Sequence, residues 1–358
     1  MQFGILGLPK VGKTTLFNTL TAAREATGKF DAAGAAHVGV ARVPDPRLVK
    51  LRDLFQPKKF TPATVEYVDI PGISKGEGAE SLDLAKLKGV DGLLHVVRAF
   101  EDPEIPHPGG RLDPASDIAT LDLELILADH SLVERRLERL AKGKKGLSAQ
   151  EEREQALLAG TVLPALEAER PLRRLALAGE DEKLLRGYQL LSAKPLLVAV
   201  NVAEAEVARA RPEDFGLVAH GEGAGLHGVV VSAPIELEIS RLAPDEQREF
   251  LADLGLAEPS LDRVVRACYE LLGLIAFFTV GEDEVRAWTI RRGATAREAG
   301  GTIHSDIERG FIRAEVTRWD DLLRLKTLAA CREQALLRLE GKEYVIEDGE
   351  VVHFRFNV

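Results

Sequence analysis

The sequence contains little cysteine and no long apolar run. Cys268 and Cys331 are the only two cysteines among 358 residues, too few for a disulfide framework or a metal site with four cysteine ligands. Both lie in apolar helical stretches, where we expect small core residues. No segment approaches the roughly 18 consecutive apolar residues of a membrane-spanning helix. We therefore expect a soluble chain with no membrane partner.

The start of the chain shows no export signal. Residues 1–7 run directly into an apolar strand, without the basic segment, apolar segment and cleavage site of a signal peptide, so we expect a cytoplasmic protein. The net charge of −10 argues against broad attraction to nucleic acid, although local basic patches are compatible with an acidic total. At 358 residues the chain exceeds the usual size of one hydrophobic core, which predicts two or three domains.

Apolar strand-like segments alternate with helical patterns in much of the chain. Because strands that alternate with helices form parallel sheets, the pattern predicts an α/β fold with a mainly parallel sheet. In such a sheet ligands bind at the carboxyl ends of the strands. The expected strands are residues 3–6, 64–70, 92–97, 195–200 and 228–231.

Two regions depart from this alternation. Residues 116–192 are charged and helical, and predict an inserted antiparallel helical hairpin with Lys142, Lys144 and Lys145 near its turn. The hairpin is either a solvated strut or an arm that binds a partner. Residues 275–358 predict a separate α+β domain, which leaves 1–115 and 193–274 as a discontinuous nucleotide-binding domain.

An Asp-Gly pair marks the end of the last domain. Asp348-Gly349 separates the alternating segments 344–346 and 351–356. Because Asp-Gly is a strong signal for a two-residue hairpin turn, we expect these segments to pair with each other as strands.

The strongest motif is Gly7–Thr14, which fits G-x-x-x-x-G-K-[ST] between a strand and a helix. In such a loop backbone N–H groups converge on phosphate oxygens, Lys13 adds a positive charge, and the Thr14 hydroxyl can ligate Mg²⁺. The chain is therefore predicted to be a P-loop nucleotide hydrolase. The nucleotide-binding residues expected here are Pro9, Lys10, Val11, Gly12, Lys13, Thr14 and Thr15.

A second motif, Asp69-Ile70-Pro71-Gly72, ends the next expected strand. At this place Asp69 can hold Mg²⁺ and the Gly72 N–H can meet the γ-phosphate. We expect Lys13, Asp69 and Gly72 to be the catalytic residues. Residue Ile73 stands where Ras-like switches carry a water-orienting Gln, so hydrolysis must be slow or use another group.

Two later segments predict a base-binding site. Asn201-Val202-Ala203-Glu204 stands where GTPases keep N-K-x-D, and Ser232-Ala233 stands where they keep S-A. The order of the four motifs is that of a GTPase-type G domain. An Asp in the position of Glu204 would accept hydrogen bonds from guanine, and Val202 replaces the Lys whose stem would cover the base. Because Glu204 is one methylene longer, we expect weakened guanine specificity.

These motifs resemble the YchF family of Obg-like ATPases over essentially the whole chain. The stretches that carry the resemblance are residues 44–48, 69–73, 95–102, 201–204, 285–289, 310–316 and 353–358. The resemblance implies a G domain interrupted by a helical hairpin and a C-terminal β-grasp domain of the TGS type. It also implies Mg²⁺-dependent hydrolysis of ATP in preference to GTP, and association with the ribosome and ribosomal RNA.

The sequence departs from the family pattern at two places. Lys10 stands where the family has Asn, and residues 30–39 lack the expected Mg²⁺-ligating Thr of the first switch. Asn at the first place helps to hold a monovalent cation in cation-activated P-loop proteins. We hypothesise that the Lys10 ammonium substitutes for that cation, with a solvent-exposed lysine as the alternative.

Two other functions stay open at this point. One is a GTPase on the same fold with relaxed base choice, which binds GTP or GDP through the carboxylate of Glu204. The other is an interaction protein in which the nucleotide is mainly structural. His95 lies in an apolar strand, so we expect a hydrogen-bonded core histidine and no catalytic role.

Overall fold

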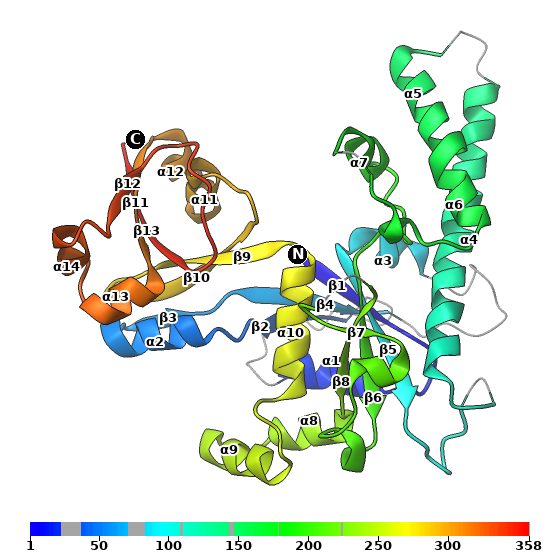
Figure 1. Cartoon of the computed structure of the whole chain (residues 1–358), viewed down its shortest axis with the longest axis horizontal. Helices are drawn as coiled ribbons and strands as arrows, with labels where there is room; N and C mark the ends of the chain where they lie inside the picture. The colour runs from blue at the N-terminus through cyan, green and yellow to red at the C-terminus, as the bar shows by residue number, and fades with distance from the viewer. Residues whose placement is uncertain are drawn as a thin grey trace. The chain divides into compact units, whose positions relative to one another are not determined.

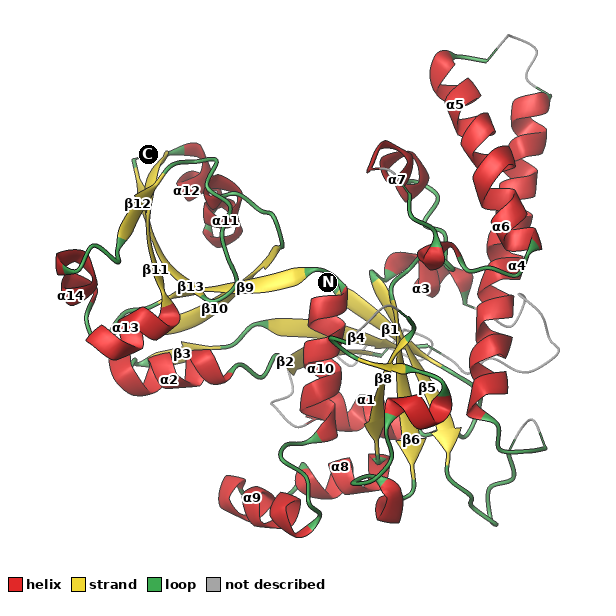
Figure 2. Cartoon of the chain, viewed as in Figure 1, coloured by secondary structure: helices red, strands yellow, loops and turns green. Residues whose placement is uncertain are grey.

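The computed structural model describes residues 1–22, 37–70, 83–107, 110–142, 147–177, 179–222 and 225–357. Its contacts divide the chain into two compact units. One unit comprises residues 1–39 and 66–264, and the other comprises residues 40–65 and 265–358. Figures 1 and 2 show the elements of both units. None of the described helices combines the length and apolar composition that crossing a membrane requires.

The first unit is built on a seven-stranded sheet with strand order β2-β4-β1-β5-β6-β8-β7. The registers between β1 and β4, β1 and β5, β5 and β6, and β6 and β8 are all parallel, which confirms the predicted α/β fold. The strands are β1 (Gln2–Leu6), β2 (Val38–Arg42), β4 (Thr64–Asp69), β5 (Gly92–Ala99), β6 (Leu196–Val202), β7 (Val218–Ala219) and β8 (His227–Val231).

The central strands are buried along their length because their sequences are nearly continuous apolar runs. All seven residues of β6 are buried, as expected for a parallel strand covered on both faces. Helices supply the cover: two core clusters join sheet residues to residues of α3 (Leu84–Gly89), α8 (Ala233–Ile239) and α9 (Pro244–Asp253). Helix α1 (Lys13–Ala22) follows β1, and α10 (Ser260–Leu271) contains residues of both units.

A helical arm projects from this sheet, as the sequence predicts (Figure 2). Helix α4 (Pro114–Ala141) runs one way, and α5 (Ala149–Leu157), a π-helical segment (Leu158–Val162) and α6 (Leu163–Glu167) run back beside it. A further helix, α7 (Gly179–Arg186), follows. The buried Asp129 of α4 accepts hydrogen bonds from the N–H groups of Leu191 and Ser192, at 2.8 and 2.7 Å. This carboxylate ties the returning chain to the long helix.

The second unit contains a six-stranded sheet with strand order β12-β11-β13-β9-β10-β3. The strands are β3 (Lys59–Thr61), β9 (Leu274–Thr279), β10 (Glu284–Arg291), β11 (Phe311–Arg318), β12 (Arg338–Glu340) and β13 (Glu350–Phe356). Its helices are α2 (Pro46–Phe55), α11 (Ala296–Ile303), α12 (Ser305–Arg309), α13 (Trp319–Leu325) and α14 (Leu328–Glu333). Residues of α11 and α12 share a core cluster with Phe277, Val352 and Phe354.

Residues 40–65 belong to the second unit, although the predicted boundaries place them inside 1–115. Strand β3 pairs in parallel with β10, and the Thr61 hydroxyl donates to Glu284 at 2.6 Å. Asp45 caps α2, and Arg47 bonds both Asp45 and Asp348. The contacts of this segment are therefore made with residues far along the chain, which a boundary drawn by composition cannot detect.

The predicted hairpin at Asp348-Gly349 is wrong. Strand β13 pairs with β11 and β9, and of the segment 344–346 only Val345 forms a bridge, to Thr295. The Asp348 carboxylate accepts from the Ala276 N–H at 3.0 Å, and the Gly349 N–H donates to the Ala276 carbonyl at 2.8 Å. The Asp-Gly pair thus forms hydrogen bonds with the backbone of β9 and does not close a local hairpin.

Candidate nucleotide site

The phosphate loop Gly7–Thr14 joins β1 to α1 and needs glycine at two positions. Gly7 has φ 149° and Gly12 has φ 98°, where residues with a side chain are strained. A Cβ on Gly7 would lie 2.3 Å from the Val96 carbonyl oxygen, and one on Gly12 would lie 2.5 Å from Asn201 Nδ2. The loop therefore packs directly on β5 and on the end of β6.

Lys13 is the first residue of α1 and its ammonium lies inside the loop. Nζ donates to the carbonyl oxygens of Gly7 at 2.9 Å and Leu8 at 2.6 Å, and the residue is 9% exposed. Burial lowers the pKa of Lys13 to about 8, and the negative charge of Asp69 opposes this shift. The charge is thus held where phosphate oxygens would compete with the two carbonyls for its protons.

Asp69 ends β4, next to β1, in register with Ile5. Its side chain is partly buried, and burial raises the pKa of the carboxyl, while Lys13 and then His37 lower it. The Asp69 N–H donates to the His37 carbonyl at 3.0 Å. Lys13 and Asp69, the predicted catalytic pair, therefore lie close enough for each charge to affect the pKa of the other group.

Asn201 connects the phosphate loop to the segment after β8. Its Nδ2 donates to the Val11 carbonyl at 3.0 Å, and its Oδ1 accepts from the Ala233 N–H at 3.0 Å. The side chain is 2% exposed, so these bonds are shielded from water. The sequence predicted a nucleotide-binding residue here, and the geometry shows a clamp between the phosphate loop and the start of α8.

The other base-site residues differ in exposure. Val202 is 1% exposed and packs in a core cluster, so its side chain offers no surface to a base. Glu204 is exposed at the start of a short 3₁₀-helix, Glu204–Glu206. Ser232 is fully buried and, among the described residues, its hydroxyl has no hydrogen-bond partner. Ala233 contributes its backbone N–H to Asn201.

The remaining predicted positions lie on the loop or outside the described residues. Thr14 and Lys10 are exposed, Pro9 and Thr15 are partly buried, and Val11 is buried. Lys10 has φ 64°, a left-handed conformation in which Asn is favoured over Lys. Gly72 and Ile73 lie outside the residues that the structure describes.

His95 is a buried histidine of β5, 1% exposed. Burial, with the positive charges of Lys13 and Arg173, lowers its pKa to about 3. Within the described part of the chain its Nδ1 has no hydrogen-bond partner, so the expected core histidine is buried, but this ring nitrogen lacks the expected hydrogen bond.

The site has few metal-binding side chains of its own. Among the described residues no group of three or more His, Cys, Asp or Glu side chains could hold a metal ion. A Mg²⁺ ion at a phosphate loop needs fewer, because substrate phosphates and waters supply most of its ligands. One hydroxyl at Thr14 and one carboxylate at Asp69 fit that requirement.

Comparison with known proteins agrees with this geometry. Residues 2–126 match a family model described as a 50S ribosome-binding GTPase. Residues 274–357 match a model described as a protein of unknown function and named for the C-terminal part of YchF GTPases.

Full-length relatives cover both units. The chain is 44% identical to the ribosome-binding ATPase YchF of Bacillus subtilis, over 99% of both chains. It is 41% identical to the protein of the same name from Escherichia coli O157:H7, again over 99% of both. The solved structure of the Schizosaccharomyces pombe YchF GTPase superposes with a TM-score of 0.86 at 30% identity, covering 99% of this chain and 97% of that one. This chain belongs to the YchF family.

Proposed function

We propose that this protein is a nucleotide-dependent switch that hydrolyses ATP to ADP and phosphate, with Mg²⁺ as cofactor. The burial of the Lys13 ammonium inside a glycine-bounded loop supports nucleotide binding. The Bacillus and Escherichia relatives are named as ATPases and the Schizosaccharomyces relative as a GTPase. Their names therefore leave base choice to be argued from the site.

The chain's own groups would bind and orient the triphosphate. Lys13 would exchange its bonds with Gly7 and Leu8 for bonds with phosphate oxygens, and the N–H groups at the start of α1 would face the same anion. Asp69 and the Thr14 hydroxyl would hold Mg²⁺, which neutralises charge on the β- and γ-phosphates when bound. The Gly72 N–H is proposed to donate a hydrogen bond to the γ-phosphate.

The burial of Val202 carries the proposed preference for ATP. In a guanine site the residue at this position covers the base with a long stem, and an Asp two residues later pairs with guanine. Here the Val202 side chain is buried in the core. The Glu204 side chain is one methylene longer than Asp, so its carboxylate cannot take the position that pairs with guanine. One bidentate base contact is worth about 1–3 kcal/mol of discrimination by analogy with base readout in nucleic acids, so its loss removes the preference for GTP.

Competition between ATP and GTP for the wild-type protein tests base choice. We expect ATP to bind more tightly, and Glu204→Asp to shift the ratio toward GTP. Adding Val202→Lys would complete the GTPase pattern but would place an ammonium in the core, so the single variant is the cleaner test. A wild-type preference for GTP of about tenfold or more, about 1.4 kcal/mol, would contradict the ATPase proposal.

The second candidate is a GTPase with relaxed base choice. The exposure of Glu204 favours it, because the carboxylate is accessible to a base. Equal turnover of both nucleotides would support this candidate. Tight binding of either nucleotide without turnover would instead support an interaction protein with a structural nucleotide.

Ribosome association in the cytoplasm is the cellular part of the proposal. The Bacillus and Escherichia relatives are named as ribosome-binding, and the helical arm and the C-terminal unit carry basic side chains that can contact RNA phosphate. Lys142 lies at the end of α4, and Arg291, Arg292, Arg309 and Arg313 lie in the second unit.

A further inference from the structure

Strand β13 loses one of its two neighbouring strands soon after it begins. On one side it pairs with β11 from Glu350 to Phe356. On the other side its register with β9 consists of the single pair Val351–Phe278, and β9 ends at Thr279. Among the described residues no strand pairs with this side of β13 beyond Val351. The edge from Val352 to Phe356 is therefore open, and at about 3.4 Å per residue it spans about 17 Å.

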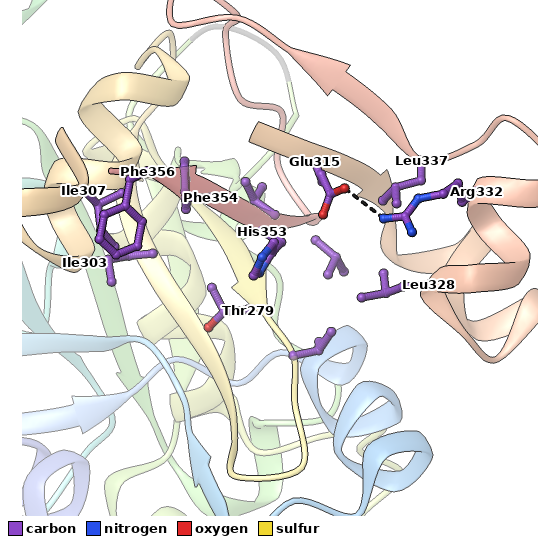
Figure 3. Close-up of a pocket in the computed structure, with 13 residues that line it drawn as sticks. Thr279, Ile303, Ile307, Glu315, Leu328, Arg332, Leu337, His353, Phe354 and Phe356 are labelled. Carbon is purple, nitrogen blue, oxygen red and sulfur yellow. Dashed lines mark hydrogen bonds and ion pairs between the residues drawn. The ribbon is translucent and has the colours of Figure 1, made fainter. Parts of the chain in front are cut away.

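A pocket of about 240 Å³ lies at this open edge. Figure 3 shows its lining in two groups. Ile303, Ile307 and Phe356 lie on the side of α11 and α12, together with Phe354. Glu315, Arg332 and Leu328 lie on the other side, with His353 and Thr279 between the groups.

The two sides differ in chemistry because side chains alternate across a strand. On the side of α11 and α12 the pocket wall is apolar, and Phe356 is 46% exposed. On the other side the Glu315 carboxylate accepts from Arg332 at 2.8 Å and also from Arg355. The two guanidinium side chains are 60% and 51% exposed. One carboxylate thus faces two arginines, which leaves a net positive charge on that side.

We propose that the open edge of β13 binds an extended segment of a partner protein, which adds to the sheet as a strand beside Val352–Phe356. A strand in this place would continue the sheet where β9 stops. Its backbone would form hydrogen bonds with the N–H and C=O groups along the open edge of β13. Its side chains would alternate between the apolar wall and the arginines. The partner segment therefore has apolar residues at every second position and acidic residues between them.

A protein segment fits the pocket better than RNA does. Most of the lining is aliphatic or aromatic, and an exposed strand edge offers backbone donors and acceptors that a peptide matches.

The test uses the full-length protein and a labelled peptide of alternating Glu and Val. We expect binding at least about tenfold tighter, about 1.4 kcal/mol, than that of a matched peptide of alternating Lys and Val. Hydrogen exchange should slow in Val352–Phe356 when the acidic peptide is bound. The same peptide with N-methyl groups on alternate backbone amides should lose binding, because it cannot pair with a strand edge.

Two exposed apolar residues of the same unit provide matched variants. Phe356→Ser removes part of the pocket wall and should weaken the peptide at least about fivefold, about 1 kcal/mol. Leu339→Ser, on β12 and 60% exposed, lies outside the lining and should leave binding unchanged. Equal loss in both variants would contradict the proposal, as would equal binding of the N-methylated peptide. Two further results would overturn the proposal. One is no detectable binding of the acidic peptide at a concentration of about 1 mM, which corresponds to a binding free energy of about 4 kcal/mol. The other is tighter binding of oligouridylate when it competes with the peptide.

Discussion

At the scale of single residues, Lys13 combines a buried charge with a predicted role in phosphate binding. Its pKa is lowered to about 8 by burial, whereas a bound triphosphate favours the charged form. Nucleotide affinity should therefore fall as the pH rises through about 8. Nucleotide titrations of the wild type between about pH 7 and 9.5 measure this. An affinity that stays constant over this range would contradict the assignment.

The control for the pH dependence is Lys13→Ala, which should bind nucleotide weakly at every pH while keeping its fold. Stability supplies a second readout. Because the folded pKa lies below the usual 10.5, the unfolded chain binds more protons between these values. The contribution of Lys13 to the free energy of unfolding should therefore rise with pH from about 8 to 10.5, and this rise should be absent in the variant.

Asn201 predicts a coupled loss of stability and binding. Asn201→Ala leaves the Val11 carbonyl and the Ala233 N–H without their buried partner, at about 1–3 kcal/mol for each unsatisfied group. Urea denaturation should show this loss, and nucleotide affinity should fall because the phosphate loop is no longer held. Asn201→Asp keeps an acceptor for Ala233 but buries a carboxylate against the Val11 carbonyl oxygen, so it should lose at least as much stability. Unchanged stability in the alanine variant would contradict the clamp.

Lys10 predicts the response to monovalent cations. If its ammonium substitutes for a cation beside the phosphates, hydrolysis should depend little on K⁺, and Lys10→Asn should create a dependence. The left-handed backbone at this position suits Asn, so the variant should fold at least as well. Rates of hydrolysis in K⁺ and Na⁺ measure the effect. Strong stimulation of the wild type by K⁺ would contradict the hypothesis.

The sequence predicts those residues whose role depends on near neighbours. Gly7, Gly12 and Lys13 follow from one short motif, because the loop, the strand before it and the helix after it are contiguous. The clamp of Asn201 joins groups that are 190 and 32 residues away from it. A motif match marks the position of Asn201 but not these partners.

At the scale of elements, the predicted strands of the first unit are present because each is a short apolar run. The helical arm is also present, since its charged helical pattern is a local signal. The prediction of a hairpin at Asp348-Gly349 is wrong because the local preference for a turn competes with hydrogen bonds to a distant strand. Asp348 binds the N–H of Ala276, and no local pattern records that contact.

The attachment of the helical arm depends on Asp129. Asp129→Ala would leave the buried N–H groups of Leu191 and Ser192 without acceptors, at about 1–3 kcal/mol each. We expect lower stability in urea and faster hydrogen exchange around residue 191. Glu134→Ala on the same helix removes only a surface pair with His130 and should cost about 0–1 kcal/mol. Similar effects of both substitutions would contradict the anchoring role.

At the scale of the whole molecule, the acidic total of −10 means that RNA contact must use local basic groups. Ribosome association should weaken steadily as salt rises, because each phosphate contact releases a counterion. Replacing Arg291 and Arg292 by Glu should reduce both the binding and its dependence on salt. Arg248→Glu, on α9 in the other unit, should change neither. Absence of cosedimentation at low salt, with and without ATP, would contradict the proposal.

The assignment of residues 40–65 to the second unit also sets an order of events during synthesis. Thr61 bonds Glu284 across 223 residues. At about 5–20 residues per second on the ribosome, the early segment waits roughly 11 to 45 s for its partner strand. Helix α2 and strand β3 therefore emerge long before the other strands of the six-stranded sheet exist. We therefore expect this early segment to stay unfolded in the nascent chain, where a chaperone could bind it until translation nears its end.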